Sequence, residues 1–388
     1  NGTIDFSDSI DGGFNVTLDR GAGAIGVGGA IGGSTPIKVL DINHGDGAGI
    51  ITLAGGIGNQ TSKASGTTAG SAVDIGNATT ASITLGKASV SRVFSTDGAT
   101  EFTTTGTNPD IDLIGTGVEF QTSDNTLTFT GGAIHLANDG ANLTIGTGSG
   151  DITLTAIRGT DNETVSITSS GTVNTKAIGN AHEIETVAIE GGTIKIGGNI
   201  TTDGDGDVTL TGPVQLAVDN ITIDTSSASS GDGGNVSLTS TLNSKSGQTR
   251  GLTITTKAGT VSIGGVVGDT VAVGALSINT NGTDTGTITL NGIGDGTPAL
   301  GSGAATIGNT ATTGMTLNGD FYDTGAATYS TDGTAIVVNK GSDGTTEFGP
   351  TDSAIQFVGG NIDVANGTNL SISSGSGAIT VAGIRGTS

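Results

Sequence analysis

Three aspartates that alternate with glycines carry the clearest capacity for chemistry in this sequence. They are Asp203, Asp205 and Asp207 in the string TDGDGDV. Carboxylates at alternate positions can converge on one hard cation when glycines let the loop curl, and Ca²⁺ prefers such oxygen ligands. An EF-hand would also need a bidentate glutamate about eleven residues after the first aspartate, where this chain has Val214. The motif therefore predicts either a surface Ca²⁺ site of another kind or a plain acidic turn, and no other cofactor is expected.

The three histidines are a second source of metal or proton-transfer chemistry. His44, His135 and His182 lie far apart in the sequence, and the first two correspond to Thr280 and Asp363 in an internal repeat described below. A metal or catalytic site built on them would exist in one copy only. We expect the histidines to be solvated loop residues rather than ligands.

Two acidic pairs have the residue types needed to cleave a polysaccharide. Glu119 precedes Asp124, and Glu347 precedes Asp352 with the same spacing. Paired carboxylates act as general acid and base in glycoside hydrolysis. Sugar-binding grooves usually offer exposed aromatic rings, but strand alternation points the nearby phenylalanines inward; these are Phe120, Phe129, Phe348 and Phe357. We therefore predict that the chain is not an enzyme, and keep a polysaccharide-active enzyme as the less favoured alternative.

Two arginines occupy the same place in two nearly identical strings. Arg158 lies in TGSGDITLTAIRGTD, and Arg385 lies in SGSGAITVAGIRGTS. Either residue could form an ion pair that repeats along a fibre, but an exposed pair contributes little. We expect both arginines to be solvated turn residues.

The elements that carry these residues are short strands. The recurring unit is an apolar-polar-apolar triplet bounded by Gly, Asn or Asp, as in GIITLAGG, GDITLTA and GTITLNG. Such a triplet predicts a β-strand with two aliphatic side chains on one face and a threonine on the other. Strands recur about every 8 to 12 residues without helical periodicity. Residues 181–198 are the most helix-like stretch, and there too Gly-Gly and alternation favour strands.

The composition favours an elongated fold. Of 388 residues 72 are glycine, none is Cys or Trp, and aromatic residues make up 3%. Tandem β-sandwich domains, the alternative fold, usually need bulky residues between their sheets. A right-handed parallel β-solenoid (β-helix) tolerates small side chains because like residues stack in ladders. We predict this fold, with three strands in each coil of about 25 to 32 residues and glycines at the corners.

The charge and the absence of a long apolar run exclude several partners. The formal charge is -23, which repels nucleic acid and anionic lipid. No stretch approaches 18 apolar residues, so we expect no membrane insertion in this segment. The chain begins at Asn1 rather than Met, and we expect it to be a mature or trimmed portion of a longer protein.

A long internal repeat spans most of the chain. GGAIHLANDGANLTIGTGSGD matches GGNIDVANGTNLSISSGSGA, EFQTSDNTLTFTGG matches EFGPTDSAIQFVGG, and the FSTDG at Phe94 matches the YSTDG at Tyr329. One copy therefore covers residues 1–234, and 235–388 form a partial second copy of the same solenoid. Residues 161–234 predict what a continuation after Ser388 would resemble.

Three strings resemble the β-strand-repeat regions of large bacterial surface proteins, of the filamentous-haemagglutinin and autotransporter-adhesin kind. They are VGGAIGGSTPIKVLDI, GTITLNGIG and GDVTLTGPVQLAVDNITIDT. The resemblance implies a secreted, right-handed parallel β-helix that acts as an adhesin, a matrix fibre or a cell-surface layer.

Together these features predict an extracellular structural protein at the cell surface, a segment of a fibre, sheath, surface layer or adhesin stalk. Expected partners are further copies, end to end or side by side, other modules of the same longer chain, and surface glycans. The alternative function is an adhesin module that binds glycans or neighbouring cells.

Overall fold

The computed structural model describes most of the chain. The described residues are 2–43, 45, 48–59, 65–105, 110–160, 162–179, 182–226, 232–297, 301–341, 344–349 and 352–387. The chain divides into two compact units, Asn1–Thr193 (unit 1) and Ile194–Ser388 (unit 2). The two units are defined by the contacts within each of them and not by sequence repetition. The super-repeat boundaries at 1–234 and 235–388 therefore stay a prediction.

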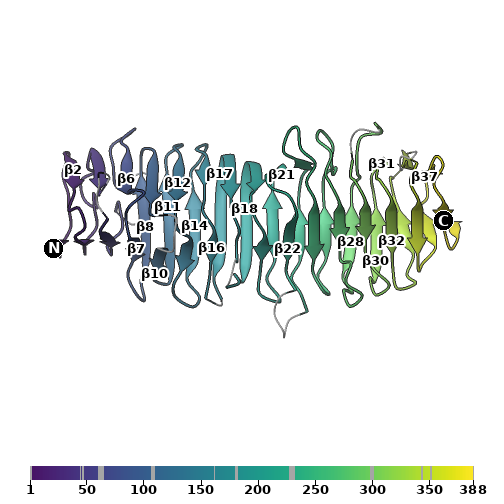
Figure 1. The fold of residues 1–388 in the computed structure, drawn as a ribbon, viewed down its shortest axis with the longest axis horizontal. Helices are drawn as coiled ribbons and strands as arrows, with labels where there is room; N and C mark the ends of the chain where they lie inside the picture. The colour runs from purple at the N-terminus through teal and green to yellow at the C-terminus, as the bar shows by residue number, and fades with distance from the viewer. Residues whose placement is uncertain are drawn as a thin grey trace. The chain divides into compact units, whose positions relative to one another are not determined.

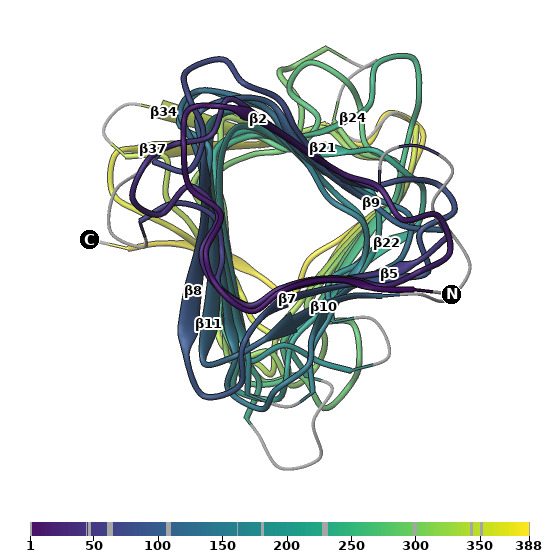
Figure 2. The ribbon, with the colours of Figure 1, turned by 90° about the vertical axis from the view of Figure 1, so that its left-hand side faces the viewer.

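Each unit is a parallel β-solenoid, as predicted, and no helix occurs among the described residues. Every coil has three sides, numbered here so that equal numbers in the two units mark strands of matching sequence. In unit 1 the chain passes clockwise from β7 to β8 to β9 while it recedes from the viewer, so the coils are right-handed (Figure 2). Tandem sandwiches, the alternative, are not formed because the named strands pair in parallel with the next coil.

The strands of unit 1 stack along three ladders (Figure 1). Side 1 contains β1 (Ile4–Phe6), β3 (Ile25–Val27), β5 (Ile50–Leu53), β7 (Ser82–Gly86), β10 (Ile111–Ile114), β13 (Ile134–Leu136) and β16 (Ile157–Arg158). Side 2 contains β8 (Ser91–Thr96), β11 (Gly117–Thr122), β14 (Asn142–Gly146) and the first part of β17 (Thr164–Thr175). Side 3 contains β2 (Asn15–Leu18), β4 (Val39–Ile42), β6 (Val73–Gly76), β9 (Thr100–Thr103), β12 (Leu127–Thr130), β15 (Ile152–Thr153) and the end of β17.

Unit 2 repeats the three ladders. Side 1 contains β20 (Val208–Thr211), β23 (Val236–Leu238), β26 (Val261–Ile263), β28 (Thr287–Leu290), β30 (Gly314–Leu317), β33 (Ile336–Val338), β36 (Ile362–Val364) and β39 (Ile384–Gly386). Side 2 contains β21 (Val214–Leu216), β24 (Leu242–Ser244), β31 (Phe321–Tyr322), β34 (Gly344–Phe348) and β37 (Thr368–Ile372). Side 3 contains β19 (Ile200–Thr201), β22 (Ile221–Asp224), β25 (Leu252–Thr255), β27 (Leu276–Ile278), β29 (Ala305–Ile307), β32 (Ala327–Ser330), β35 (Ile355–Val358) and β38 (Ile379–Thr380). The remaining strand, β18 (Thr186–Ile196), lies in the ambiguous stretch and confirms the strand prediction there.

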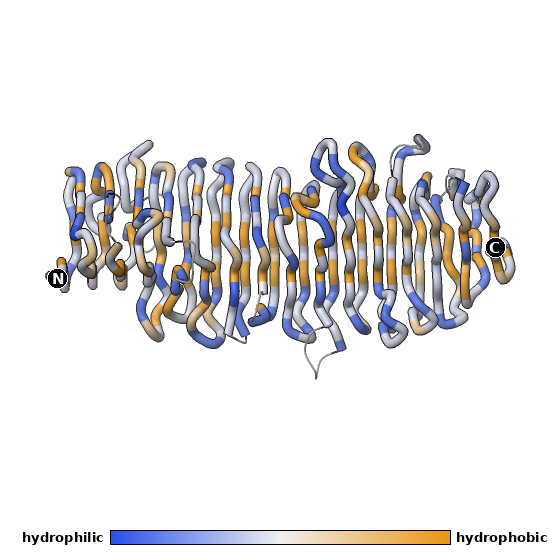
Figure 3. The backbone as a smooth tube through the Cα atoms, viewed as in Figure 1, coloured by the Kyte–Doolittle hydropathy of each residue, from blue (hydrophilic) through white to orange (hydrophobic). Residues whose placement is uncertain are grey.

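The core follows from the alternation of side chains along each strand. In β12 the burial pattern places Leu127 and Phe129 inside and turns Thr128 outward, as predicted from the triplets. Figure 3 shows the result as hydrophobic bands that run from coil to coil within each unit. The sequence distance between residues paired in parallel varies from 20, for Ile194 and Val214, to 37, for Ile57 and Phe94. Coil length is therefore less regular than predicted, because corners of different length close onto the same three sides.

Corner residues adopt the left-handed backbone conformation that the glycine content predicts. Among non-glycine residues, Asn43 (φ 57°) and Asn279 (φ 47°) hold matching corners of the two units. The amide group of Asn279 compensates for the strain, because its Oδ1 accepts the N–H of Thr256 at 2.8 Å and its Nδ2 donates to the Thr256 hydroxyl at 2.9 Å.

Four aromatic rings fill the interior of each unit at matching positions. In unit 1 Phe94 stacks on Phe120 (5.3 Å between centroids) and Phe102 stacks on Phe129 (5.0 Å). In unit 2 Tyr322 stacks on Phe348 (4.8 Å) and Tyr329 stacks on Phe357 (5.2 Å). All eight rings are almost fully buried, which confirms the predicted inward orientation of the four phenylalanines.

The ring clusters correct one part of the repeat alignment. Phe94 lies on side 2 in β8, whereas Tyr329 lies on side 3 in β32 and pairs with Phe357. Phe94 therefore corresponds to Tyr322, and Tyr329 corresponds to Phe102. The predicted match between the strings FSTDG and YSTDG is wrong, because the two strings form different corners of the coil.

The two tyrosine hydroxyls of unit 2 have different surroundings. The Tyr322 hydroxyl donates to the carbonyl oxygen of Leu290 at 2.9 Å and accepts the N–H of Gly319 at 3.1 Å. The Tyr329 hydroxyl is buried and has no hydrogen-bond partner in the structure. Burial raises the pKa of both phenols.

Candidate functional site

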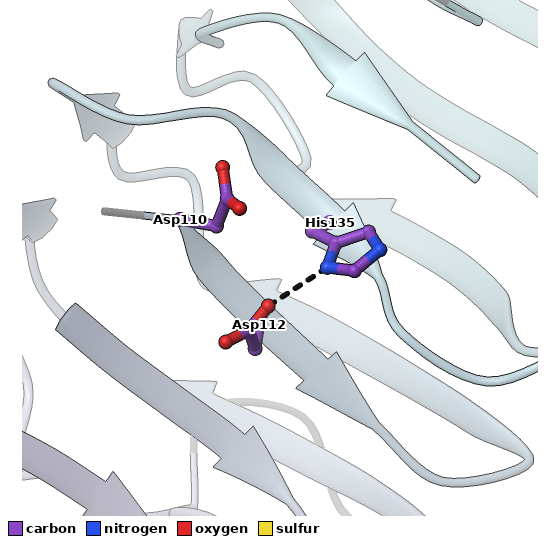
Figure 4. A group of neighbouring side chains, drawn as sticks. All are labelled: Asp110, Asp112 and His135. Atoms are coloured by element: carbon purple, nitrogen blue, oxygen red, sulfur yellow. Dashed lines mark hydrogen bonds and ion pairs between the residues drawn. The ribbon is translucent and has the colours of Figure 1, made fainter. Parts of the chain in front are cut away.

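Among the described residues, a group of side chains that could bind a metal ion lies on side 1 of unit 1. Strands β10, β13 and β16 place Asp112, His135 and Arg158 in register on the outer face. Outward parity follows from the sequence, because Ile111, Ile134 and Ile157 pair beside them and are buried. Asp110 stands just before β10 and joins the same group (Figure 4).

One hydrogen bond and one ion pair organise this group. His135 Nδ1 lies 2.8 Å from Asp112 Oδ1, and the Arg158 guanidinium contacts Asp110 through Nη2. The side chains are 21% exposed for His135 and 18% for Asp110, so the group is accessible from solvent but partly covered. The first contact joins β10 to β13 and the second joins Asp110 to β16, so the column has a structural role in linking three coils.

The same group has the donor atoms of a metal site. One ligand atom each from Asp110, Asp112 and His135 lies within 4.8 Å of the other two. Imidazole nitrogen and carboxylate oxygen together suit Zn²⁺ and related cations. Arg158 opposes a cation here, because its positive charge already neutralises Asp110.

Unit 2 replaces this group with a single ion pair. The residues that match Asp110, Asp112 and His135 are Ala335, Val337 and Asp363. Arg385 binds Asp363 with two hydrogen bonds, Nε to Oδ1 at 2.5 Å and Nη2 to Oδ2 at 2.9 Å. The Arg385 hydrogen bond lowers the pKa of the Asp363 carboxyl. The possible metal ligands are therefore confined to one copy of the repeat. This agrees with the sequence, in which His135 corresponds to Asp363.

Two expectations about these residues are wrong. His135 is a strand residue hydrogen-bonded to Asp112 rather than a solvated loop residue, because outward positions of adjacent strands bring the two side chains together. Arg158 and Arg385 are likewise strand residues in ion pairs and not free turn residues. His182 is exposed as expected, and His44 lies outside the described residues.

The predicted calcium ligands are engaged in backbone hydrogen bonds. Asp203 Oδ1 accepts the N–H of Gly204 at 2.7 Å, and Asp205 Oδ1 accepts the N–H of Asp232 at 2.9 Å. Asp207 Oδ1 accepts the N–H of Asn235 at 2.7 Å. The three carboxylates do not form a compact ligand group of the kind found at His135. Calcium binding at these residues stays a prediction.

The carboxylates considered for polysaccharide cleavage lie at different positions of the coil, the glutamates on strands and the aspartates at corners. Glu119 lies on β11 and accepts a hydrogen bond from Gln121. Asp124 (φ 59°) and Asp352 (φ 48°) occupy matching corners, and their carboxylates accept the N–H groups of Ser149 and Ser376. Glu347 lies on β34. Both corner aspartates thus connect one coil to the next.

An acidic hollow lies on side 2 of unit 2. It has a volume of about 200 Å³ and is lined by Asp269, Asp295, Asp320 and Phe321, among others. Lys340 pairs with Asp320 at 2.8 Å. Burial raises the pKa of the neighbouring Asp323 carboxyl.

Sequence reasoning missed Asp110 and Asp112. Their signal is the string DID, which places two acids around the inward Ile111. Their proximity to His135 depends on the coil length of 23 residues at this point, which the register between Asp112 and His135 reveals.

Comparison with known proteins finds no matching family model, no matching curated protein and no matching solved structure. Among the described residues no helix is long and apolar enough to cross a membrane.

Proposed function

We propose that this chain is an extracellular structural protein, a repetitive solenoid segment of a fibre, sheath, surface layer or adhesin stalk. The observation that carries the proposal is the contrast between what the two units share and what they do not. Both units keep the same four-ring cluster with the same alternation of stacked and edge-on contacts. The Asp110, Asp112 and His135 group occurs in unit 1, and its counterparts in unit 2 are Ala335, Val337 and Asp363. The repeated feature is therefore the scaffold, and the chemically active group is not repeated.

The coil-to-coil contact explains how such a scaffold extends. In unit 1 Ile152 is covered by Val173 and Ile157 by Ile178 of the following coil. Each added coil repeats this contact and leaves a new strand edge, so solenoid stability is close to a sum of neighbour contacts. Copies or modules that stack coils in this way assemble end to end.

The surface composition supports a location outside the cell. The chain has no cysteine and a formal charge of -23, which suit an exposed, soluble surface that needs no redox chemistry. The resemblance to the repeat regions of bacterial surface proteins leads to the same location.

Electron microscopy of the purified chain over a range of concentrations tests this function. We expect extended assemblies that lengthen with concentration. A glycan array probed with the same preparation serves as the comparison. Isolated particles at every concentration, together with selective glycan binding, would contradict the structural role and favour the adhesin module.

A further inference from the structure

Four asparagines of unit 2 are followed directly by glycine. They are Asn281, Asn291, Asn318 and Asn366. The main-chain nitrogen of such a glycine can attack the side-chain amide of the asparagine, because glycine has no Cβ to hinder the approach and adopts many backbone conformations. The attack requires that the glycine nitrogen and the asparagine side chain are both free to move. The four pairs therefore share one chemistry, and the local structure decides which of them react.

Hydrogen bonds hold both reacting groups at Asn318. The attacking group, the N–H of Gly319, donates to the Tyr322 hydroxyl at 3.1 Å. The leaving group, Asn318 Nδ2, donates to Asn291 Oδ1 at 3.2 Å. Gly319 is also buried, and a Cβ placed on it would lie 2.3 Å from the Cα of Gly292. The main chain at Asn318 therefore has little room to turn towards the side chain.

Asn291 is held in a similar way on the preceding coil. Its Nδ2 donates to the carbonyl oxygen of Gly264 at 2.7 Å, and its Oδ1 accepts the hydrogen bond from Asn318. The following residue, Gly292, is buried. These contacts join three successive coils at the end of β26, β28 and β30. Attack on Asn291 requires them to break first.

The other two pairs are exposed and lie at corners of the coil. Asn281 and Gly282 are both exposed, and no atom lies within 4 Å of the position that a Cβ on Gly282 would take. Asn366 and Gly367 are exposed as well, and Gly367 has φ 78°. Among the described residues, no hydrogen bond holds either asparagine side chain or the N–H of the glycine that follows it.

We propose that Asn281 and Asn366 are sites of spontaneous deamidation and that Asn291 and Asn318 are protected from it. The glycine nitrogen loses its proton and bonds to Cγ of the asparagine, the Cγ–Nδ2 bond breaks, and ammonia leaves. Water then opens the resulting succinimide ring at one of its two carbonyl carbons and gives aspartate or isoaspartate. Water is the only co-reactant, and each event adds one negative charge to a chain whose formal charge is -23.

The two reactive sites differ in what the modification disturbs. Asn281 closes a turn with Asp284, because its N–H donates to Asp284 Oδ2 at 3.2 Å and its carbonyl oxygen accepts the N–H of Asp284 at 2.9 Å. Asp284 is 1% exposed. Isoaspartate at position 281 adds a methylene group to the main chain of this turn and sets a second carboxylate beside Asp284. The turn at Asn366 is closed by the N–H of Thr368 and the carbonyl oxygen of Ala365 instead. Modification at Asn281 should therefore destabilise unit 2 more.

The hydrogen bonds set the expected size of the difference in rate. We expect each exposed site to react at least about ten times faster than either protected site. This fold-change corresponds to about 1.4 kcal/mol, which is the size of one to two hydrogen bonds that must break before the attack.

Peptide mapping of a single preparation tests the proposal, because the four sites serve as controls for one another. The folded chain is kept in neutral buffer at physiological temperature for several weeks, and samples are digested and analysed by mass spectrometry for aspartate and isoaspartate. A second sample is kept in denaturant, where all four pairs should react at similar rates. Similar rates at the four sites of the folded chain, or faster reaction at Asn291 or Asn318, would overturn the proposal.

Gly282→Ala tests the exposed class of sites. Gly282 does not adopt the left-handed conformation and has space for a Cβ, so the variant should fold as the parent does. The added methyl group should slow deamidation of Asn281 about tenfold and leave Asn366 unchanged. An unchanged rate at Asn281 would show that the reaction there does not pass through the glycine nitrogen, and the assigned chemistry would be wrong.

Tyr322→Phe tests the protected class, because it removes the acceptor of the Gly319 N–H. The variant should deamidate faster at Asn318, whereas the rate at the distant Asn281 should stay the same. Circular dichroism shows whether the variant is folded. If the folded variant is as resistant at Asn318 as the parent, the hydrogen bond does not provide the protection and this part of the proposal is wrong. None of these outcomes depends on assembly of copies, so they leave the test of the proposed structural function separate.

Discussion

Replacing Tyr329 by phenylalanine should make unit 2 more stable. The ring of Tyr329 stacks on Phe357, and the variant keeps this contact. The hydroxyl is buried without a hydrogen-bond partner, whereas the matching residue of unit 1 is Phe102, which has no polar group to bury. Mutational data place the cost of burying an unpaired hydroxyl at about 1–3 kcal/mol. We expect Tyr329→Phe to recover an amount of this order.

Thermal and denaturant unfolding measure the effect. For a unit of 150–250 residues each kcal/mol shifts Tm by about 2–4 °C. Tyr322→Phe is the matched control, because its hydroxyl has partners at Leu290 and Gly319 and its loss should destabilise by about 1–3 kcal/mol. The reverse change, Phe102→Tyr, should destabilise unit 1.

Tyr329→Phe and Tyr322→Phe should change the free energy of unfolding in opposite directions. If Tyr329→Phe lowers the stability as much as Tyr322→Phe does, the Tyr329 hydroxyl has a partner in solution. The assignment of an unpaired hydroxyl would then be wrong.

Three further predictions concern ionisable groups. The chain has two tyrosines, both in unit 2, and burial raises the pKa of each above the ordinary tyrosine value of about 10. The unfolded chain therefore ionises first, and the free energy of unfolding should fall as the pH rises above about 10. Tyrosinate absorbance should appear together with the loss of circular dichroism, and separate transitions would contradict this. Burial raises the pKa of the Asp284 carboxyl, so the folded state favours its protonated form. Acidification towards the ordinary aspartate pKa should therefore make the Asp284 contribution to the stability of unit 2 more favourable. Asp284→Asn should be more stable than the parent at neutral pH, and an unchanged pH dependence of its denaturant midpoint would refute the assignment. Arg385 lowers the pKa of the Asp363 carboxyl. The carboxylate therefore stabilises the folded state above the ordinary aspartate pKa, and this stabilisation is lost as the pH falls. Asp363→Asn should lower the free energy of unfolding at neutral pH. The variant should also lose less of this free energy on acidification than the parent does, as measured by urea titration. Equal losses in variant and parent would contradict the assignment.

The fold could be predicted from sequence because its determinants are local. A triplet such as Ile152, Thr153 and Leu154 specifies a strand and its inward face without reference to any other segment. Repetition of that pattern at short intervals with glycine corners leaves few alternatives to a solenoid. The inward phenylalanines followed from the same alternation.

The side-chain group at His135 could not be predicted because it depends on distances between coils. His135 meets Asp112 because the register between β10 and β13 is 23 residues at that point, while other coils differ by many residues. Short matching strings do not fix this distance. The FSTDG string at Phe94 and the YSTDG string at Tyr329 are nearly identical, yet they lie on different sides of their coils.

The short sequence distance between paired strands also has a kinetic consequence. All-β proteins usually fold slowly because distant segments must meet before any contact is gained. Among the described residues, those paired in parallel lie 20 to 37 residues apart in a chain of 388. The loop that must close to add one coil does not grow with the length of the chain, and its entropy depends only weakly on the variation between coils. The contact order of each unit is therefore set by a single coil, and folding can advance from a formed coil to the next at a rate independent of how many coils follow.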